Sequence, residues 1–290
     1  MIRVDHLYHS YHNDGNYSVK DVSFHVDEGE IFGFLGPSGA GKSTTQNILT
    51  GLLPLQKGKV IVNGVDISKE RRKRFNQIGV SFEQSNLYSK LTALENLTYY
   101  AKLFDVPTRD PMELIRMVGL DGKEHTKAGD FSKGMKHRLT FARSLINHPK
   151  LWFLDEPTTG LDPAIAQDIK DIIREENQKG VTAFLTTHNM HIAEELCDRV
   201  AFIVDGEIKL IDSPKNLKLQ YGKKAVEVEY LDHGILKKET LTLVLPEDKK
   251  RLEMIIDRYE VLTMHSKEAS LEEIFVKVTG KGLTADEVTE

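Results

Sequence analysis

Cysteine is nearly absent from this sequence. Its 290 residues include a single cysteine, Cys197, so the chain cannot form an internal disulfide. Proteins that depend on disulfides are mostly secreted, whereas proteins of reducing compartments do without them. We therefore expect the chain to work in a reducing compartment, with Cys197 as a buried and unreactive thiol.

Long hydrophobic runs are absent as well. A transmembrane helix needs roughly 20 predominantly apolar residues, and no uninterrupted apolar stretch approaches that length. The first residues, Met1-Ile2-Arg3-Val4-Asp5-His6, lack the apolar core of a signal peptide. We expect that the chain does not cross a membrane by itself.

An excess of positive charge is also lacking. The chain has 39 Lys and Arg residues against 44 Asp and Glu residues, for a formal net charge of −5. Proteins that bind nucleic acid usually present a strongly basic face. The composition therefore argues against a nucleic-acid partner and fits an ordinary globular protein of one or two domains.

Short apolar stretches alternate with helical patterns over most of the chain, which predicts a parallel sheet covered by helices on both faces. Two early segments alternate between apolar and polar residues, and Asn63-Gly64 is a typical hairpin turn. The region from Leu87 to Asn147 is mostly helical in pattern. The expected strands are residues 2–7, 19–26, 30–35, 59–62, 65–67, 78–82, 151–154, 183–186 and 200–204, and the expected first helix is 42–53.

The pattern changes after Tyr221-Gly222. Residues 224–231 and 237–245 alternate as two antiparallel strands, and residues 249–258 and 270–279 have helical spacing. We therefore predict an α/β domain over 1–222, with a helical subdomain at about 87–147, and a small α+β domain over 223–290. At Asp232-His233 a turn is a better reading than a metal pair, because neighbouring strand residues point to opposite faces.

A glycine-rich loop follows the expected strand at 30–35. The run Gly36-Pro37-Ser38-Gly39-Ala40-Gly41-Lys42-Ser43 matches the pattern G-x-x-x-x-G-K-[ST]. The glycines let backbone N–H groups turn toward phosphate oxygens, and the following helix directs its positive end to the same point. Lys42 adds a full charge against the phosphates, and the Ser43 hydroxyl is suited to Mg²⁺. The loop therefore predicts a nucleotide triphosphate site.

Two carboxylates end the apolar strand expected at 151–154. Asp155 should lie at the carboxyl end of the sheet, beside the phosphate loop, where it can hold Mg²⁺ directly or through water. Strand alternation would turn Glu156 the other way, and we expect it to orient and deprotonate the attacking water.

With these motifs in place, the chain resembles the ATP-binding subunits of ABC transporters from Met1 to about Tyr221. The run Phe131-Ser132-Lys133-Gly134-Met135 is similar to the family's L-S-G-G-Q signature. Four further motifs follow the family order. They are Tyr11 as the aromatic residue that stacks on adenine, with Tyr8 and Tyr17 as alternatives, Gln84 as the Q-loop glutamine, Gly160-Leu161-Asp162 as the D-loop, and His188 in Thr186-Thr187-His188 as the switch histidine.

The resemblance implies a P-loop NTPase fold of the ABC type. This fold has a RecA-like core, an antiparallel β subdomain and a helical subdomain, to which a small α+β C-terminal domain is added here. Its cofactors are ATP and Mg²⁺, and Glu156, His188 and Gln84 are the implied catalytic residues. The implied metal contacts are Ser43, Gln84 and Asp155, and the implied ATP contacts are Tyr11, Gly36, Pro37, Ser38, Gly39, Ala40, Gly41, Lys42, Ser43, Thr44, Ser132, Gly134 and Asp162.

The resemblance also implies two partners. One is a second ATP-binding subunit, identical or different, whose signature completes the site at Lys42. The other is a transmembrane permease subunit, which would dock near Ser85–Leu97 and hold the chain on the cytoplasmic face of the membrane.

The signature departs from the common form, because Lys133 replaces a glycine and Met135 replaces the glutamine. This form resembles the ABC-2 type exporter subfamily, and Ser270-Leu271-Glu272-Glu273-Ile274-Phe275 resembles that subfamily's C-terminal domain. We therefore expect an ATPase subunit that powers export of a solute such as a drug, an antibiotic or a lipid. The alternatives are an importer subunit, an ABC ATPase without a transport role, and a catalytically inactive binding module, against which the intact Glu156 and His188 argue.

Overall fold

The structure is a computed structural model that describes residues 1–12, 15–69, 75–222 and 225–282. The chain forms two compact units, Met1–Ser213 and Pro214–Lys281. The second unit begins before helix α8 (Pro214–Tyr221), whereas the sequence pattern placed a boundary after residue 222. The difference arises because α8 packs against α10 (Leu271–Thr279), a contact that local sequence does not reveal.

The first unit is built around a six-stranded sheet with the order β10-β9-β3-β8-β7-β6. Its strands are parallel except β10, which pairs antiparallel with β9. The central strands are buried on both faces, as the apolar runs predicted. The strands are β3 (Ile31–Leu35), β6 (Ile78–Ser81), β7 (Leu151–Asp155), β8 (Thr182–Thr187), β9 (Arg199–Val204) and β10 (Glu207–Asp212).

Strand β10 was not expected from the sequence. Its side chains are only partly buried, so it lacks the apolar run that identified the other strands. The Asp205-Gly206 turn, with both residues at positive φ, returns the chain beside β9. Cys197, which precedes β9, is buried as expected, and burial raises the pKa of its thiol.

A second sheet of the first unit is antiparallel, with the order β2-β1-β4-β5. The side chain of Phe24 on β2 stacks on Phe32 of the core sheet, with ring centroids 5.5 Å apart, and the two sheets share one hydrophobic core. The predicted antiparallel subdomain is therefore confirmed. Its strands are β1 (Ile2–His9), β2 (Val19–Val26), β4 (Lys57–Val62) and β5 (Val65–Asp66).

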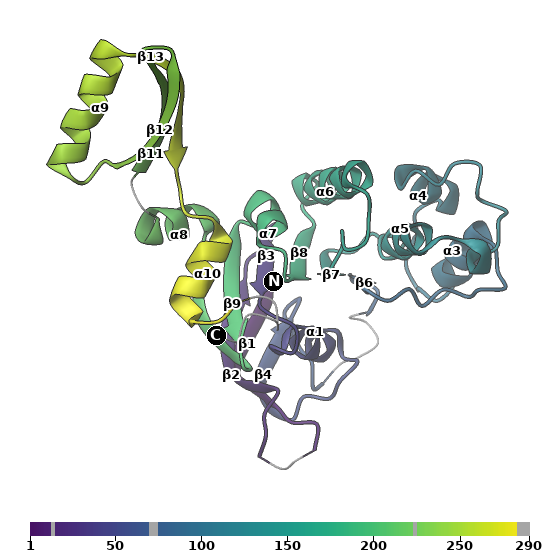
Figure 1. The fold of residues 1–290 in the computed structure, drawn as a ribbon. Coiled ribbons are helices and arrows are strands. Elements are labelled where there is room, and N and C mark those ends of the chain that lie inside the picture. The colour runs from purple at the N-terminus through teal and green to yellow at the C-terminus, as the bar shows by residue number, and fades with distance from the viewer. Residues whose placement is uncertain (13–14, 70–74, 223–224, 283–290) are drawn as a thin grey trace. The chain divides into compact units, whose positions relative to one another are not determined.

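Helices occupy the chain between β6 and β7, and Figure 1 shows them grouped beside the β6 edge of the core sheet. They are α3 (Ala93–Ala101), α4 (Pro111–Met117) and α5 (Lys133–Arg143), with a 3₁₀ turn at Ala128–Asp130. The other helices that the structure describes in this unit follow the core strands: α1 (Lys42–Thr50) after β3, α6 (Pro163–Gln178) after β7 and α7 (Met190–Leu196) after β8. Helix α1 is shorter than expected because it ends at Gly51, which has φ 81°. Within the described ranges, no helix is both long and apolar enough to traverse a bilayer.

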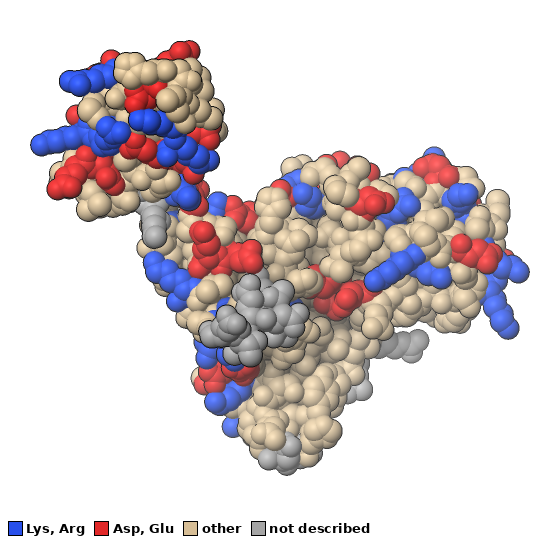
Figure 2. All heavy atoms as spheres, viewed as in Figure 1, with Lys and Arg blue, Asp and Glu red and all other residues tan. Residues whose placement is uncertain are grey.

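The second unit contains a three-stranded antiparallel sheet, β12-β11-β13, with α9 (Pro246–Arg258), α8 and α10. The turn predicted at Asp232-His233-Gly234 is confirmed, since β11 (Ala225–Asp232) and β12 (Ile235–Thr242) pair up to it. Strand β13 (Glu260–Lys267) was missed because most of its side chains are exposed and give no clear alternation. Lys and Arg side chains are interspersed with Asp and Glu side chains on the face of this unit shown in Figure 2.

Candidate active site

The carboxyl ends of β3, β6, β7 and β8 lie at one edge of the core sheet, because these strands are parallel. Open α/β sheets bind ligands beyond this edge. A cavity of about 480 Å³ lies there. It is lined by Tyr11, Ser18, Ser38, Gly39, Gly41, Lys42, Ser43, Thr44, Glu83, Asp155, Glu156 and His188.

The phosphate loop joins β3 to α1 and forms one wall of this cavity. Gly41 has φ 104°, and a Cβ atom there would lie 2.5 Å from the Ser18 carbonyl oxygen, so only glycine fits. The Lys42 ammonium donates to the carbonyl oxygens of Gly36 (2.6 Å) and Pro37 (3.0 Å). Burial lowers the pKa of Lys42, against the effect of the nearby carboxylates. A phosphate group in the loop would compensate the buried ammonium charge.

Asp155 is the last residue of β7. The Thr186 hydroxyl, on the neighbouring strand β8, donates to its carboxylate at 2.6 Å. Burial raises the pKa of Asp155, and the charges of Glu156 and Glu83 raise it further. Three carboxylates thus lie near one another with Lys42 as the adjacent cation, an arrangement that a bound cation would stabilise.

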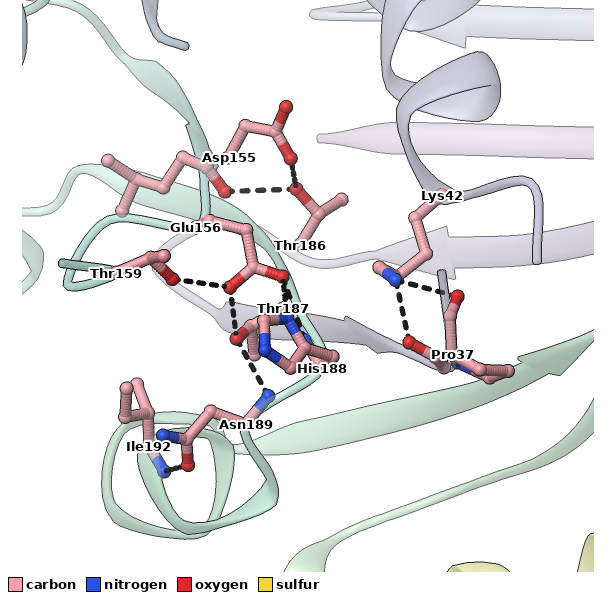
Figure 3. A network of polar contacts seen from close by, with 12 residues as sticks. Pro37, Lys42, Asp155, Glu156, Thr159, Thr186, Thr187, His188, Asn189 and Ile192 are labelled. Atoms are coloured by element: carbon pink, nitrogen blue, oxygen red, sulfur yellow. Dashed lines mark hydrogen bonds and ion pairs between the residues drawn. The ribbon is translucent and has the colours of Figure 1, made fainter. Parts of the chain in front are cut away.

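Glu156 follows in a left-handed backbone conformation, with φ 47°, and is 7% exposed. Its carboxylate accepts hydrogen bonds from the hydroxyl groups of Thr187 (2.8 Å) and Thr159 (3.1 Å) and from the His188 main chain (2.9 Å). The His188 ring nitrogen Nδ1 lies 2.6 Å from the same carboxylate. Figure 3 shows these side chains converging from the ends of β7 and β8, across from Lys42.

The alternation argument for Glu156 was wrong. The strand ends at Asp155, and the left-handed turn brings Glu156 to the same cavity instead of the opposite face of the sheet. Alternation applies only within an extended strand.

Tyr11, the aromatic residue expected to stack on adenine, also lines this cavity. The Tyr11 hydroxyl lies 3.0 Å from the Thr44 hydroxyl, and the Tyr11 side chain remains 55% exposed. Tyr8 and Tyr17 instead contact each other edge to face, with centroids 5.4 Å apart, and do not line the cavity. Tyr11 is therefore the tyrosine that a base could stack on here.

Several residues named from the sequence lie outside the cavity lining. Gln84 is exposed after β6, and the preceding residue, Glu83, reaches the cavity instead. Ser132 is the N-cap of α5, and its hydroxyl accepts the Met135 N–H at 3.2 Å. Asp162 is the N-cap residue of α6. The others that do not line it are Gly134, in the first turn of α5, and Gly36, Pro37 and Ala40, which shape the loop.

Four residues of the site were not singled out by sequence reasoning. Ser18 and Glu83 line the cavity, and no local pattern marks either residue. Thr159 and Thr187 hold the Glu156 carboxylate. Thr187 directly precedes His188 in the Thr186-Thr187-His188 motif. Its position at the end of a strand is the sequence feature that could have identified it.

The donor groups of the cavity fit Mg²⁺ together with phosphate. Proteins usually hold Mg²⁺ through one or two carboxylates and the phosphates of the substrate. Asp155, Glu83 and the Ser43 hydroxyl supply oxygen ligands on the wall of the cavity. Among residues whose placement is described, no cluster of three or more His, Cys, Asp or Glu side chains forms a complete metal site. A metal here would therefore depend on the nucleotide for its remaining ligands.

A parallel sheet with a glycine loop, a buried lysine and carboxylates at its carboxyl edge defines a nucleotide-binding ATPase of the P-loop class. The family model for the ABC transporter matches residues 19–159. The chain is 49% identical over 285 residues to a fluoroquinolones export ATP-binding protein of Mycobacterium tuberculosis, covering 98% of this chain and 95% of that one. It is 40% identical to an uncharacterized ABC transporter ATP-binding protein of Bacillus subtilis over 68% of this chain and 65% of the relative.

Solved structures agree with the sequence relatives. An ATP-binding subunit of an ABC transporter matches with a TM-score of 0.70 and 28% identity, over 76% of this chain and 93% of that one. A dimeric ATP-binding cassette bound to ADP and Pi matches with a TM-score of 0.68 and 27% identity, over 73% and 98% of the two chains. The chain belongs to the ABC transporter family. It is an ATP-binding and ATP-hydrolysing subunit of an exporter, and subunits of this kind dimerise and work with a membrane permease.

Proposed function

We propose that this chain hydrolyses MgATP to drive export through an ABC-2 type permease, as one of two subunits held on the cytoplasmic face of a membrane. The observation that carries the proposal is the single cavity that joins the phosphate loop, Asp155, Glu156 and His188. The 49% sequence identity to an export ATP-binding protein, over 98% of this chain, supports the transport role.

In the proposed reaction, the triphosphate lies over the loop and Tyr11 stacks on the base. Lys42 exchanges its bonds to the Gly36 and Pro37 carbonyls for bonds to phosphate oxygens, which are stronger because both partners are charged. Asp155 and the Ser43 hydroxyl would hold Mg²⁺, and Gln84 is a further metal contact that the family resemblance implies. When bound, Mg²⁺ would neutralise charge on the phosphates.

Glu156 then acts on the attacking water. Its carboxylate is held by Thr187, Thr159 and His188, so it is oriented before substrate arrives. It takes the proton of a water molecule placed in line with the terminal phosphorus, as a general base does. His188, whose side chain is 55% exposed at the cavity, holds that water and a phosphate oxygen in place.

Export requires that hydrolysis changes the contact between two subunits. Ser132 and Gly134, at the start of α5, would complete the partner's site from across the interface, as would Asp162 at the start of α6. The closed pair would then have contacts to the terminal phosphate that the open pair lacks, and such differential affinity is what allows a ligand to shift an equilibrium.

The permease would bind at an apolar groove near the predicted docking segment, residues 85–97. This groove has a volume of about 320 Å³, and two of the side chains that line it, Leu52 and Leu103, are each 59% exposed. A groove with exposed apolar side chains is suited to a protein contact. The groove is lined by Thr50, Leu52, Phe75, Asn76, Ile78, Val80, Phe82, Tyr100, Leu103, Phe104 and Asp105.

The proposed cargo is a drug-like compound, because the Mycobacterium tuberculosis relative, which is 49% identical to this chain, is named for fluoroquinolone export. The purified chain should hydrolyse ATP only when Mg²⁺ is supplied, and Leu103→Glu should keep that activity but lose co-purification with the permease. An active Leu103→Glu chain that still co-purifies would refute the docking site. Unchanged susceptibility to fluoroquinolones and to other drug-like compounds after deletion of the gene would refute the proposed cargo.

A further inference from the structure

One face of α5 packs against strand β7 and the turn that comes after this strand. Gly134, His137 and Phe141 are spaced by three and four residues, so they lie on the same side of the helix. A Cβ atom at Gly134 would lie 3.6 Å from Leu161, and the ring of Phe141 lies 4.9 Å from that of Trp152. His137 lies between these two contacts, beside the backbone of Glu156.

His137 is buried without the hydrogen bonds that buried side chains normally make. It is 5% exposed, and neither of its ring nitrogens has a hydrogen-bond partner in the described part of the chain. Burial lowers the pKa of His137, and the backbone of Glu156 opposes this effect, as an acceptor close to a ring N–H does. Native proteins rarely leave such a group unpaired unless it has a role.

Glu156 needs support from its surroundings. A residue other than glycine in a left-handed conformation costs about 1–3 kcal/mol and persists only where the neighbouring structure holds it. The Glu156 N–H donates to the Thr186 carbonyl at 2.9 Å, and its own carbonyl accepts the Thr159 N–H at 3.2 Å. The first bond ties Glu156 to strand β8, and the second closes the local turn. His137, in contrast, belongs to the helical subdomain.

We propose that His137 is a positioning residue for Glu156. Its ring N–H donates to the Glu156 carbonyl as the site closes, which fixes the left-handed turn that aims the carboxylate at the water. Because α5 begins at the Ser132 cap, the helix that would contact the partner's nucleotide also orients this subunit's own base. The inference rests on the proposed roles of Glu156 and Ser132.

Two substitutions separate positioning from packing. His137→Leu fills the site without a donor, and His137→Gln keeps an N–H of similar reach. We expect His137→Leu to lower kcat about tenfold while KM and ATP binding stay within twofold, and His137→Gln to recover kcat to within about threefold. His125→Leu, at an exposed histidine of the same subdomain, is the matched control and should leave kcat unchanged. Melting temperatures confirm that each variant is folded, and His137→Met replaces His137→Leu if the latter is not.

A double-mutant cycle tests whether His137 acts through Glu156. In a Glu156→Gln background, His137→Leu should cause no further loss in single-turnover hydrolysis, because the base it positions is already gone. An additive loss, an equal loss in His137→Leu and His137→Gln, or normal kcat in His137→Leu would overturn this inference and leave the role of Glu156 intact. Normal turnover in Glu156→Gln itself would instead overturn the proposed reaction, and the inference with it.

Discussion

His188 contacts the carboxylate of Glu156 twice, through its main-chain N–H at 2.9 Å and its ring nitrogen Nδ1 at 2.6 Å. The two residues directly follow the ends of the neighbouring strands β7 and β8, so the paired strands bring them together. Both residues line the cavity that also contains the phosphate loop.

Glu156→Gln keeps the size of the side chain and an oxygen that accepts the His188 N–H, but it removes the base. Turnover should fall by about 10²–10⁴-fold, the usual contribution of a general base. Binding of MgATP should persist, because Lys42 and Asp155 are unchanged. Hydrolysis assays combined with size-exclusion chromatography would detect the expected ATP-bound dimer, and normal turnover would show that Glu156 is not the base.

Thr187→Val removes the hydroxyl that donates to Glu156 at 2.8 Å while keeping the shape of a buried side chain. A hydrogen bond to a charged group contributes about 1.5–3 kcal/mol, so kcat should fall by roughly 10–100-fold. Thr187→Ser restores the hydroxyl and should recover most of this loss. Equal rates for the Val and Ser variants would mean that this hydroxyl does not orient the base.

Glu156 and Thr187 illustrate how much of the site could be predicted from the sequence. The phosphate loop and the Asp155-Glu156 pair were found because each is a short local pattern at the end of an apolar strand. The direction of Glu156 was predicted wrongly, because it depends on one backbone angle and on the end of the neighbouring strand, β8. Glu83 was missed for the same reason, since only the path of the chain after β6 brings it into the cavity in place of Gln84.

The prediction of the fold from the sequence had similar limits. Strands that are buried on both faces, such as β3 and β9, were predicted from composition because nearly all of their residues are apolar. Strand β10 is only partly buried, β13 is mostly exposed, and each lies at the edge of its sheet, so tertiary contacts and not local pattern decide their structure. The packing of α8 on α10, which joins residues far apart in sequence, decides where the second unit begins.

The second unit should lose stability in acid through Glu239. Hydrogen bonding to Arg251 lowers the pKa of Glu239 to about 2, compared with about 4.3 in an unfolded chain. Because the folded pKa is the lower one, the stabilisation is complete above the unfolded value and is lost as the pH falls from about 4.3 to about 2. Glu239→Gln should cost about 1 kcal/mol at pH 7, since the pair is only partly buried.

Hydrogen exchange of residues 225–267, corrected for intrinsic rates, measures this stability within the intact chain. The difference between wild type and Glu239→Gln should shrink as the pH approaches 2. Glu253→Gln, at an exposed position of the same helix as Arg251, serves as the control and should show no such difference. A difference that stays constant from pH 7 to pH 3 would exclude Glu239 as the titrating group.

A mixing experiment tests whether each ATP site is shared between two chains. Lys42→Ala and Ser132→Arg subunits should each be inactive alone, whereas their heterodimer contains one site with an intact Lys42 and an intact Ser132. Part of the ATPase activity should return on mixing. A subunit that carries both substitutions, mixed with wild type, contains two damaged sites in every heterodimer and is the matched control. The absence of recovery in verified heterodimers of the single variants would contradict the shared site.

Removal of the second unit should separate ATP binding from assembly. The cavity residues all lie within Met1–Ser213, which has its own hydrophobic core, so a chain that ends at Ser213 should fold and bind MgATP. A chain that ends at Gly222 keeps α8 but loses α10, and it exposes Leu217, which is completely buried in the full chain. This longer truncation should aggregate more readily than the shorter one, although it removes fewer residues. Light scattering and nucleotide-binding assays would compare the two.

The shorter chain should show weaker dimerisation, or ATPase activity that no longer depends on the permease, because the second unit offers contact surface but no residue of the cavity. Loss of ATP binding in a folded chain that ends at Ser213 would place the second unit in nucleotide binding, and full transport by that chain would show that the unit is dispensable.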